Sequence, residues 1–126
     1  MGIRRPAGRF LIFSRAVSAS ALAAFAILSL LLRETSGLSA LPSAEIAASA
    51  VVCALHCIDK SAAAAGAWRV PEKLLLALTL LSGGAAPWIT RQAIRHKTAR
   101  EHRYFALCEA AALAIHAALW IVPGII

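Results

Sequence analysis

The sequence predicts an all-α integral membrane protein with three transmembrane helices and one broken helical hairpin. Hydrophobic residues make up 60% of the 126 residues, charged residues make up 15%, and the mean hydropathy is +0.75. Soluble domains contain about 45–50% apolar and about 25% charged residues. Aromatic residues account for only 6% of the chain, which favours helices packed closely through small side chains. We expect a single membrane domain over residues 1–126.

Basic side chains give the chain a net charge of +7 and a pI of about 10.4. This balance is compatible with nucleic-acid binding, but basic flanks beside apolar segments are also what membrane insertion requires. The membrane interpretation explains more of the chain. We therefore expect no nucleic-acid partner.

The N-terminal part contains a basic segment, residues 1–15, and a first span, residues 16–32, which carries no charge. Adding residues 10–15 lengthens this apolar run to 23 residues. At about 1.5 Å per residue, a helix of that length crosses about 30 Å of hydrocarbon. The charge-free run also exceeds the roughly 7–15 residues of a secretion signal, so we expect it to remain as a transmembrane helix.

A second span is predicted over residues 43–65. Pro42 suits the first turn of a helix, and Gly66 suits its end. Near that end, Asp59 and Lys60 are expected to emerge at the level of the lipid headgroups.

A broken segment occupies residues 71–96. Pro71 and Glu72 indicate a helix start, and the pair Gly83 and Gly84 interrupts the apolar pattern that follows. Each arm has about ten residues, or about 15 Å of helix, which is half a bilayer. We predict a hairpin that enters the membrane and returns, with its turn at the glycine pair. The alternative is four spanning helices, the third with a kink.

The second arm of this hairpin carries Arg91 and Arg95 on one face, which also allows the arm to lie flat at the membrane surface. A last span follows over residues 104–126. In it, Glu109 and His116 are seven residues apart and share one helical face. We expect that face to point towards protein, because ionisable groups avoid lipid.

The distribution of basic residues favours the hairpin over four spans. Four of the 13 lysines and arginines precede the first span, one follows it, three lie at residues 60–73 around the connection between the second and third segments, and five lie at residues 91–103. With the N-terminus inside and a re-entrant hairpin, 12 of the 13 face the cytoplasm. Four alternating spans would divide them seven to six, against the positive-inside bias.

Four polar landmarks follow one another along the middle of the chain: Ile58-Asp59-Lys60, Arg69-Val70-Pro71-Glu72, Gly83-Gly84 and Arg95-His96-Lys97-Thr98. In this order and spacing the chain resembles a family of small bacterial membrane proteins called domain of unknown function 1294. The resemblance implies a multi-pass protein of the bacterial inner membrane. It does not imply a reaction.

Six charged or titratable residues are expected to meet at the cytoplasmic interface: Asp59, Lys60, Arg69, Glu72, His96 and Lys97. One interpretation is a structural network of ion pairs, in which Asp59 pairs with Arg69 or Lys97. The other is an anion site that holds the phosphate of a lipid headgroup or another phosphorylated ligand.

A metal site is a weaker alternative. Cys53, His56 and Cys57 have the i, i+3, i+4 spacing that presents two thiolates and an imidazole on one helical face. Cysteine also behaves as a small buried hydrophobe, and a membrane histidine also bonds across helices. We assign no metal, no cofactor and no catalytic residue.

These observations predict a non-enzymatic interaction or scaffolding protein whose basic cytoplasmic face contacts anionic lipid or a partner protein. We expect membrane lipids as partners, together with self-association or membership of a larger membrane complex. The alternatives are a small transporter or metal-binding membrane protein, and an enzyme or sensor that acts on a phosphorylated headgroup.

Overall fold

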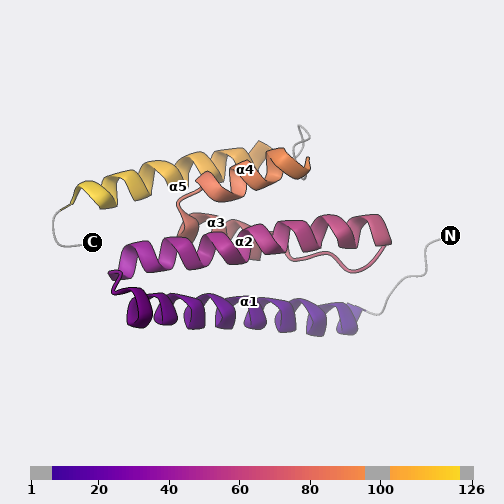
Figure 1. Cartoon of the computed structure of the whole chain (residues 1–126). Coiled ribbons are helices and arrows are strands. Elements are labelled where there is room, and N and C mark those ends of the chain that lie inside the picture. Colours follow the sequence, from indigo (N-terminus) through magenta and orange to yellow (C-terminus); the bar gives the residue numbers. More distant parts are fainter. Residues whose placement is uncertain (1–6, 96–102, 123–126) are drawn as a thin grey trace.

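The chain folds into a bundle of five α-helices (Figure 1). The computed structural model describes residues 7–95 and 103–122. The helices are α1 (Ala7–Ser36), α2 (Ala40–Ala65), α3 (Glu72–Ser82), α4 (Ala85–Ile94) and α5 (Arg103–Ile121). All regular structure in the described ranges is helical, which confirms the predicted fold class.

Three of these helices have the length and apolar composition needed to cross a membrane. They are Gly8–Ser36 with 29 residues, Ala40–Ala65 with 26 and Arg103–Ile121 with 19. Large apolar side chains such as Ile12, Leu107 and Ile121 point outward, where only a hydrocarbon environment would accept so many of them. The chain is therefore a membrane protein with three spanning helices.

Helix α1 is longer than the predicted first span, because it begins at Ala7 and includes part of the basic N-terminal segment. Its first turns carry Phe10 and Phe13, whose rings pack against Trp68 with centroid distances of 6.2 and 5.1 Å. These contacts bind the start of α1 to the α2–α3 connection. They supply a packing surface that the charge pattern alone does not reveal.

Gly66 ends α2, as the sequence predicts. It adopts a left-handed conformation with φ 68°, and its amide approaches the carbonyl groups of Ala62 and Ala63. Glycine reaches this conformation without the steric cost of a Cβ atom. The chain then turns back towards the bundle and enters α3 after Pro71.

The hairpin predicted from the glycine pair is present. Helices α3 and α4 have 11 and 10 residues, so each reaches about half of a bilayer. Gly83 and Gly84 separate them, with φ values of 88° and 87°. Figure 1 shows that α4 turns back near the middle of the bundle, so that it ends where α3 begins. The alternative of four spanning helices is wrong.

Contacts along α5 confirm the direction of the first arm. The Tyr104 hydroxyl donates to Glu72 at the start of both helices, and His116 Nε2 lies 2.7 Å from the Leu80 carbonyl near the hairpin turn. Helices α3 and α5 therefore run in the same direction.

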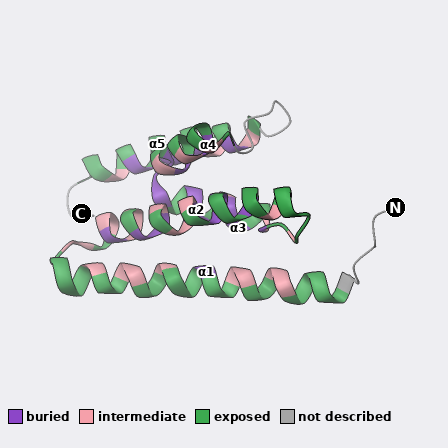
Figure 2. Cartoon of the chain, turned by 45° about the vertical axis from the view of Figure 1, so that its right-hand side comes forward, coloured by how far each residue is buried: buried purple, intermediate pink, exposed green. Residues whose placement is uncertain are grey.

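Helix α2 is the centre of the bundle. It packs against α1, α3 and α4, and its fully buried Val52 belongs to the same hydrophobic cluster as Leu75, Leu78 and Phe105. Figure 2 shows that α1, in contrast, presents mostly exposed or half-buried residues. The densest packing therefore involves α2 to α5, and α1 covers one side of α2.

Candidate functional site

Basic side chains gather at one end of the bundle. This end, called the basic end below, contains the start of α1, the α2–α3 connection, the end of α4 and the start of α5 (Figure 1). Its exposed basic residues, among those described, are Arg9, Arg15, Lys60, Arg69, Lys73, Arg95 and Arg103. At the opposite end, the described chain carries Arg33 beside Glu34.

Asp59 lies beneath the basic end and is fully buried. Its Oδ1 accepts hydrogen bonds from Arg69 Nε and from the Val70 amide, both at 2.9 Å, and its Oδ2 accepts one from Arg69 Nη2 at 2.9 Å. The hydrogen bond to Asp59, followed by its charge, raises the pKa of Arg69 above the ordinary value. Arg69, one of the two cationic partners considered for Asp59, is thus observed to pair with it, and the other, Lys97, lies outside the described residues.

These hydrogen bonds give the polar residues of the α2–α3 connection a structural role. The carboxylate holds both the side chain and the backbone of the following connection, so the chain can turn sharply and begin α3. Glu72 makes a second link, because its Oε2 accepts a hydrogen bond of 2.6 Å from the Tyr104 hydroxyl. Asp59, Arg69 and Glu72 therefore act as packing contacts between elements. His96 and Lys97 lie outside the described residues.

Lys60 does not share the buried environment of its neighbour Asp59. It lines a pocket of about 450 Å³ between the ends of α2 and α4, here called the Lys60–Arg95 pocket. Its lining consists of Cys57, Lys60, Ser61, Ala93, Ile94 and Arg95. The predicted cluster omits Arg95, although the residue begins one of the four landmarks.

Arg95 has an unusual backbone. With φ 51° and ψ 46° it is left-handed, and it is the one non-glycine residue of the described ranges with a positive φ. Its amide closes the end of α4 by approaching the carbonyl groups of Arg91 and Gln92. This conformation stops α4 at the pocket.

Arg91 is the main departure from the sequence analysis. The prediction placed it among the cytoplasmic charges, with α4 free to lie flat, but its side chain is only 2% exposed and pairs with Glu109, which is 3% exposed. Arg91 Nε donates to Oε2 at 2.7 Å and Nη2 donates to Oε1 at 2.5 Å. The guanidinium also lies 5.6 Å from the Phe105 ring centroid.

The correction has a physical reason. The Glu109 carboxylate on α5 accepts hydrogen bonds from two nitrogen atoms of the guanidinium, so burial of Arg91 does not leave an isolated charge. Helix α4 therefore packs one face against the bundle, and Thr90 on it donates a hydrogen bond of 3.0 Å to Cys53 Sγ on α2.

Glu109 and His116 both face protein, as predicted, and both are buried. His116 Nε2 lies 2.7 Å from the Leu80 carbonyl. Its Nδ1 lies 3.2 Å from Glu45 Oε1, an ion-pair distance without hydrogen-bond alignment. The same carboxylate oxygen accepts a 2.6 Å hydrogen bond from Trp120 Nε1. This group links α5 to α2 and to the last turn of α3.

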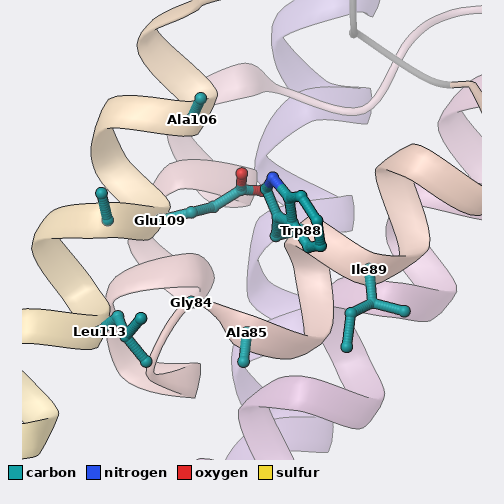
Figure 3. Close-up of a pocket in the computed structure, with 8 residues that line it drawn as sticks. Gly84, Ala85, Trp88, Ile89, Ala106, Glu109 and Leu113 are labelled. Carbon is teal, nitrogen blue, oxygen red and sulfur yellow. The ribbon is translucent and has the colours of Figure 1, made fainter.

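The hairpin turn fits tightly against α5. A Cβ atom on Gly84 would lie 2.9 Å from the carbonyl carbon of Glu109 and closer still to its oxygen, so only glycine fits there. Beside the turn, a cavity of about 430 Å³ opens between α4 and α5. Figure 3 shows Glu109 extending towards Trp88 in this otherwise apolar cavity.

The three residues considered for a metal site do not converge. Cys53 accepts the hydrogen bond from Thr90, His56 is buried with its ring centroid 5.8 Å from that of Phe105, and Cys57 is exposed. Within the part of the chain that the structure describes, no group of three or more His, Cys, Asp or Glu residues is placed to hold a metal ion.

Comparison with known families identifies the central part of the chain. Residues 49–105 match the family model described as "Protein of unknown function (DUF1294)", and searches of curated proteins and of solved structures found no match. The matched segment contains the Asp59–Arg69 pair, the glycine turn and Arg91, and it ends before Glu109. The resemblance inferred from the four landmarks is confirmed, because residues 49–105 of this membrane protein match the model of the DUF1294 family of proteins of unknown function.

Proposed function

We propose that this protein is a small interaction or scaffolding protein of the bacterial inner membrane, without enzymatic activity, whose basic end faces the cytoplasm and contacts anionic lipid. The supporting observation is the charge asymmetry of the bundle. Among the described residues, seven exposed basic side chains lie at the basic end and one lies at the opposite end. Such a bias orients multi-pass proteins with the basic side in the cytoplasm.

The energetics support contact with anionic lipid. A lysine or arginine near an anionic leaflet gains about 1 kcal/mol, so several such residues on one end create a strong preference. Two of the acids at this end are used elsewhere, since Asp59 pairs with Arg69 and Glu72 bonds to Tyr104. The remaining cations are left to interact with the membrane surface.

Two ion pairs, the buried Arg91–Glu109 pair and the part-buried Asp59–Arg69 pair, support a structural role for the polar interior. Asp59–Arg69 fixes the α2–α3 connection, and Arg91–Glu109 fixes the hairpin to α5. Each joins segments that hydrophobic packing alone would leave free to slide in a lipid environment. A rigid bundle with a charged end suits a protein that presents a surface.

Helix α1 supports the proposal of self-association or of a larger complex. It packs on α2, while most of its remaining surface is exposed in the single chain. Crosslinking in native membranes is expected to give a homodimer or a band with another protein. Recovery of monomer alone would contradict this part of the proposal.

Orientation is tested with single cysteines in a background where Cys53, Cys57 and Cys108 are replaced by alanine. In intact cells, a membrane-impermeant thiol reagent is expected to label Ser36→Cys and to leave Lys73→Cys unlabelled. Permeabilised cells, in which both variants should react, provide the control. Labelling of Lys73→Cys in intact cells would overturn the proposed orientation.

Lipid preference is tested by purification in mild detergent and analysis of the bound lipid. Anionic phospholipid is expected to be enriched relative to the membrane extract, and the enrichment should fall as salt is raised. Lipid bound in the same proportions as in the extract would contradict the proposed contact.

A further inference from the structure

The Lys60–Arg95 pocket combines two cations, a hydroxyl group and an apolar wall at the basic end of the bundle. We propose that this pocket is a specific site for one phosphate group, supplied by a phospholipid headgroup or by a soluble phosphate ester. The inference rests on the proposed function, because it assigns the general attraction for anionic lipid to a defined site.

The first argument is that the charge of Lys60 is not neutralised by its sequence neighbour. Adjacent residues of a helix point in different directions, and Asp59 is fully buried with both oxygens bonded to Arg69 and one also to Val70. Among the described residues, no carboxylate lines the pocket and no ion pair involves Lys60 or Arg95. Two positive charges therefore share one recess.

The second argument is the match between the donors and a phosphate. The Arg95 guanidinium offers a planar fork of N–H groups, Lys60 offers a compact ammonium, and Ser61 offers a hydroxyl. Phosphate oxygens accept such charge-assisted hydrogen bonds strongly. Ala93 and Ile94 add an apolar side to the pocket, which suits the glycerol and acyl portions of a lipid.

The third argument concerns the backbone that places Arg95. A left-handed residue other than glycine carries a steric cost, and Arg95 adopts this conformation where α4 ends. If α4 continued, the next residues would extend along the helix axis. Termination at this position brings the guanidinium to the pocket beside the last turns of α2.

A simpler role for both cations is to offset the negative ends of α2 and α4. That role predicts an effect on helix stability and none on phosphate. The experiment therefore measures both properties in the same variants.

Cys57 provides a reporter inside the pocket, because it is exposed and forms part of the lining. With Cys53 and Cys108 replaced by alanine, the rate at which a maleimide modifies Cys57 can be followed in the full-length chain at fixed ionic strength. One arm uses detergent micelles with added inorganic phosphate or glycerol phosphate. The other uses nanodiscs of phosphatidylcholine with or without phosphatidylglycerol.

The critical comparison is between two charge-matched variants. Lys60→Gln/Arg95→Gln removes the pocket cations, while Lys73→Gln/Arg103→Gln removes two exposed cations of the same end that do not line the pocket. The variant Lys60→Arg/Arg95→Lys keeps both pocket charges. Thermal unfolding followed by circular dichroism accompanies each measurement.

Saturable protection of Cys57 is expected in the parent chain. Loss of both pocket cations should raise the half-protecting concentration about 30-fold, which corresponds to about 2 kcal/mol. The control pair should change it less than about three-fold, because its cations do not line the pocket and salt screens exposed charges at a distance. The exchanged pair should retain protection. Protection only by phosphatidylglycerol would identify a lipid headgroup as the source, and protection by the soluble anions would identify a soluble ester.

Three outcomes would overturn the site: no protection in either arm, equal loss in the two glutamine pairs, or lowered stability of Lys60→Gln/Arg95→Gln with unchanged protection. Equal loss in both pairs with intact enrichment of anionic lipid would reject the pocket and leave the proposed function standing. Protection by soluble phosphate without any preference for anionic lipid would support the pocket and reject the proposed contact with anionic lipid.

Discussion

Replacing Arg91 by methionine provides a direct test of how the hairpin is held in the bundle. The substitution keeps a long flexible side chain but removes the hydrogen bonds of 2.7 and 2.5 Å to Glu109. The Glu109 carboxylate, 3% exposed, would lose its bidentate partner. Breaking a buried ion pair from one side costs about 3–5 kcal/mol, a large fraction of a typical folding free energy of about 5–15 kcal/mol.

The double variant Arg91→Met/Glu109→Leu separates the loss of the pair from the loss of packing. It removes both charges and fills the same space with apolar atoms, so we expect its stability to lie within about 1–2 kcal/mol of the parent. Each single variant, Arg91→Met or Glu109→Leu, should lose about 3–5 kcal/mol. The two effects would then be strongly non-additive, as expected for residues in contact.

Unfolding by sodium dodecyl sulfate in mixed micelles, followed by far-ultraviolet circular dichroism, measures these free energies. Trp88 fluorescence adds a local signal, because this side chain lies beside Glu109 in the cavity between α4 and α5 (Figure 3). Arg103→Gln, which removes an exposed arginine of α5, is the control and should change stability by about 0.5 kcal/mol or less.

The reasoning would be refuted if Arg91→Met lowered the unfolding free energy by less than about 1 kcal/mol. It would also be refuted if the effects of the two single substitutions simply added in the double variant. Either result would mean that the ion pair does not secure the hairpin.

Four further substitutions test other contacts. Gly84→Ala should lower the unfolding free energy by about 2–4 kcal/mol, because its Cβ would overlap the Glu109 backbone. Gly66→Ala, which has open space around it, should lower it by about 1–2 kcal/mol. Equal losses in detergent titrations would contradict this ranking. Asp59→Asn should cost about 2 kcal/mol. Asp59 raises the pKa of Arg69, so the guanidinium stays charged until the pH rises through that higher value. Thermal melts at about pH 6 and about pH 9 should therefore show the same loss of stability in Asp59→Asn. A loss of stability confined to the lower pH would argue against the pairing. His116→Leu should speed amide exchange at the hairpin turn about five-fold, because the bond to the Leu80 carbonyl is worth about 1 kcal/mol, and unchanged exchange would show that this bond does not hold the turn.

Several features of the fold could be predicted from local sequence. Apolar segment length predicts the spans, since a helix must cover the hydrocarbon thickness. The glycine pair predicts the hairpin turn, because two successive left-handed residues require glycine. Gly66 marks the end of α2 for the same reason. The shared face of Glu109 and His116 follows from helical periodicity, and both are buried as predicted.

The candidate site was less accessible to prediction. The sequence places Asp59 and Lys60 together in one interfacial cluster, but the structure sends the acid inward to Arg69 and the lysine towards Arg95. It also buries Arg91, which the charge pattern assigns to the cytoplasmic side. Helical periodicity turns Asp59 and Lys60 in different directions, but it does not show which segment each one meets. Nothing in the spacing marks Arg91 for burial, because its partner Glu109 lies on another helix.

The sequence by itself determined the environment of this protein, the number of its spanning helices and the position of its re-entrant turn, because these depend on segment length, periodicity and glycine. Only the tertiary structure decided which charges are neutralised in the interior and which remain available at the basic end. That choice depends on how each helix is rotated and aligned against its neighbours. Side-chain packing between distant segments fixes that rotation, so it cannot be read from one helix alone.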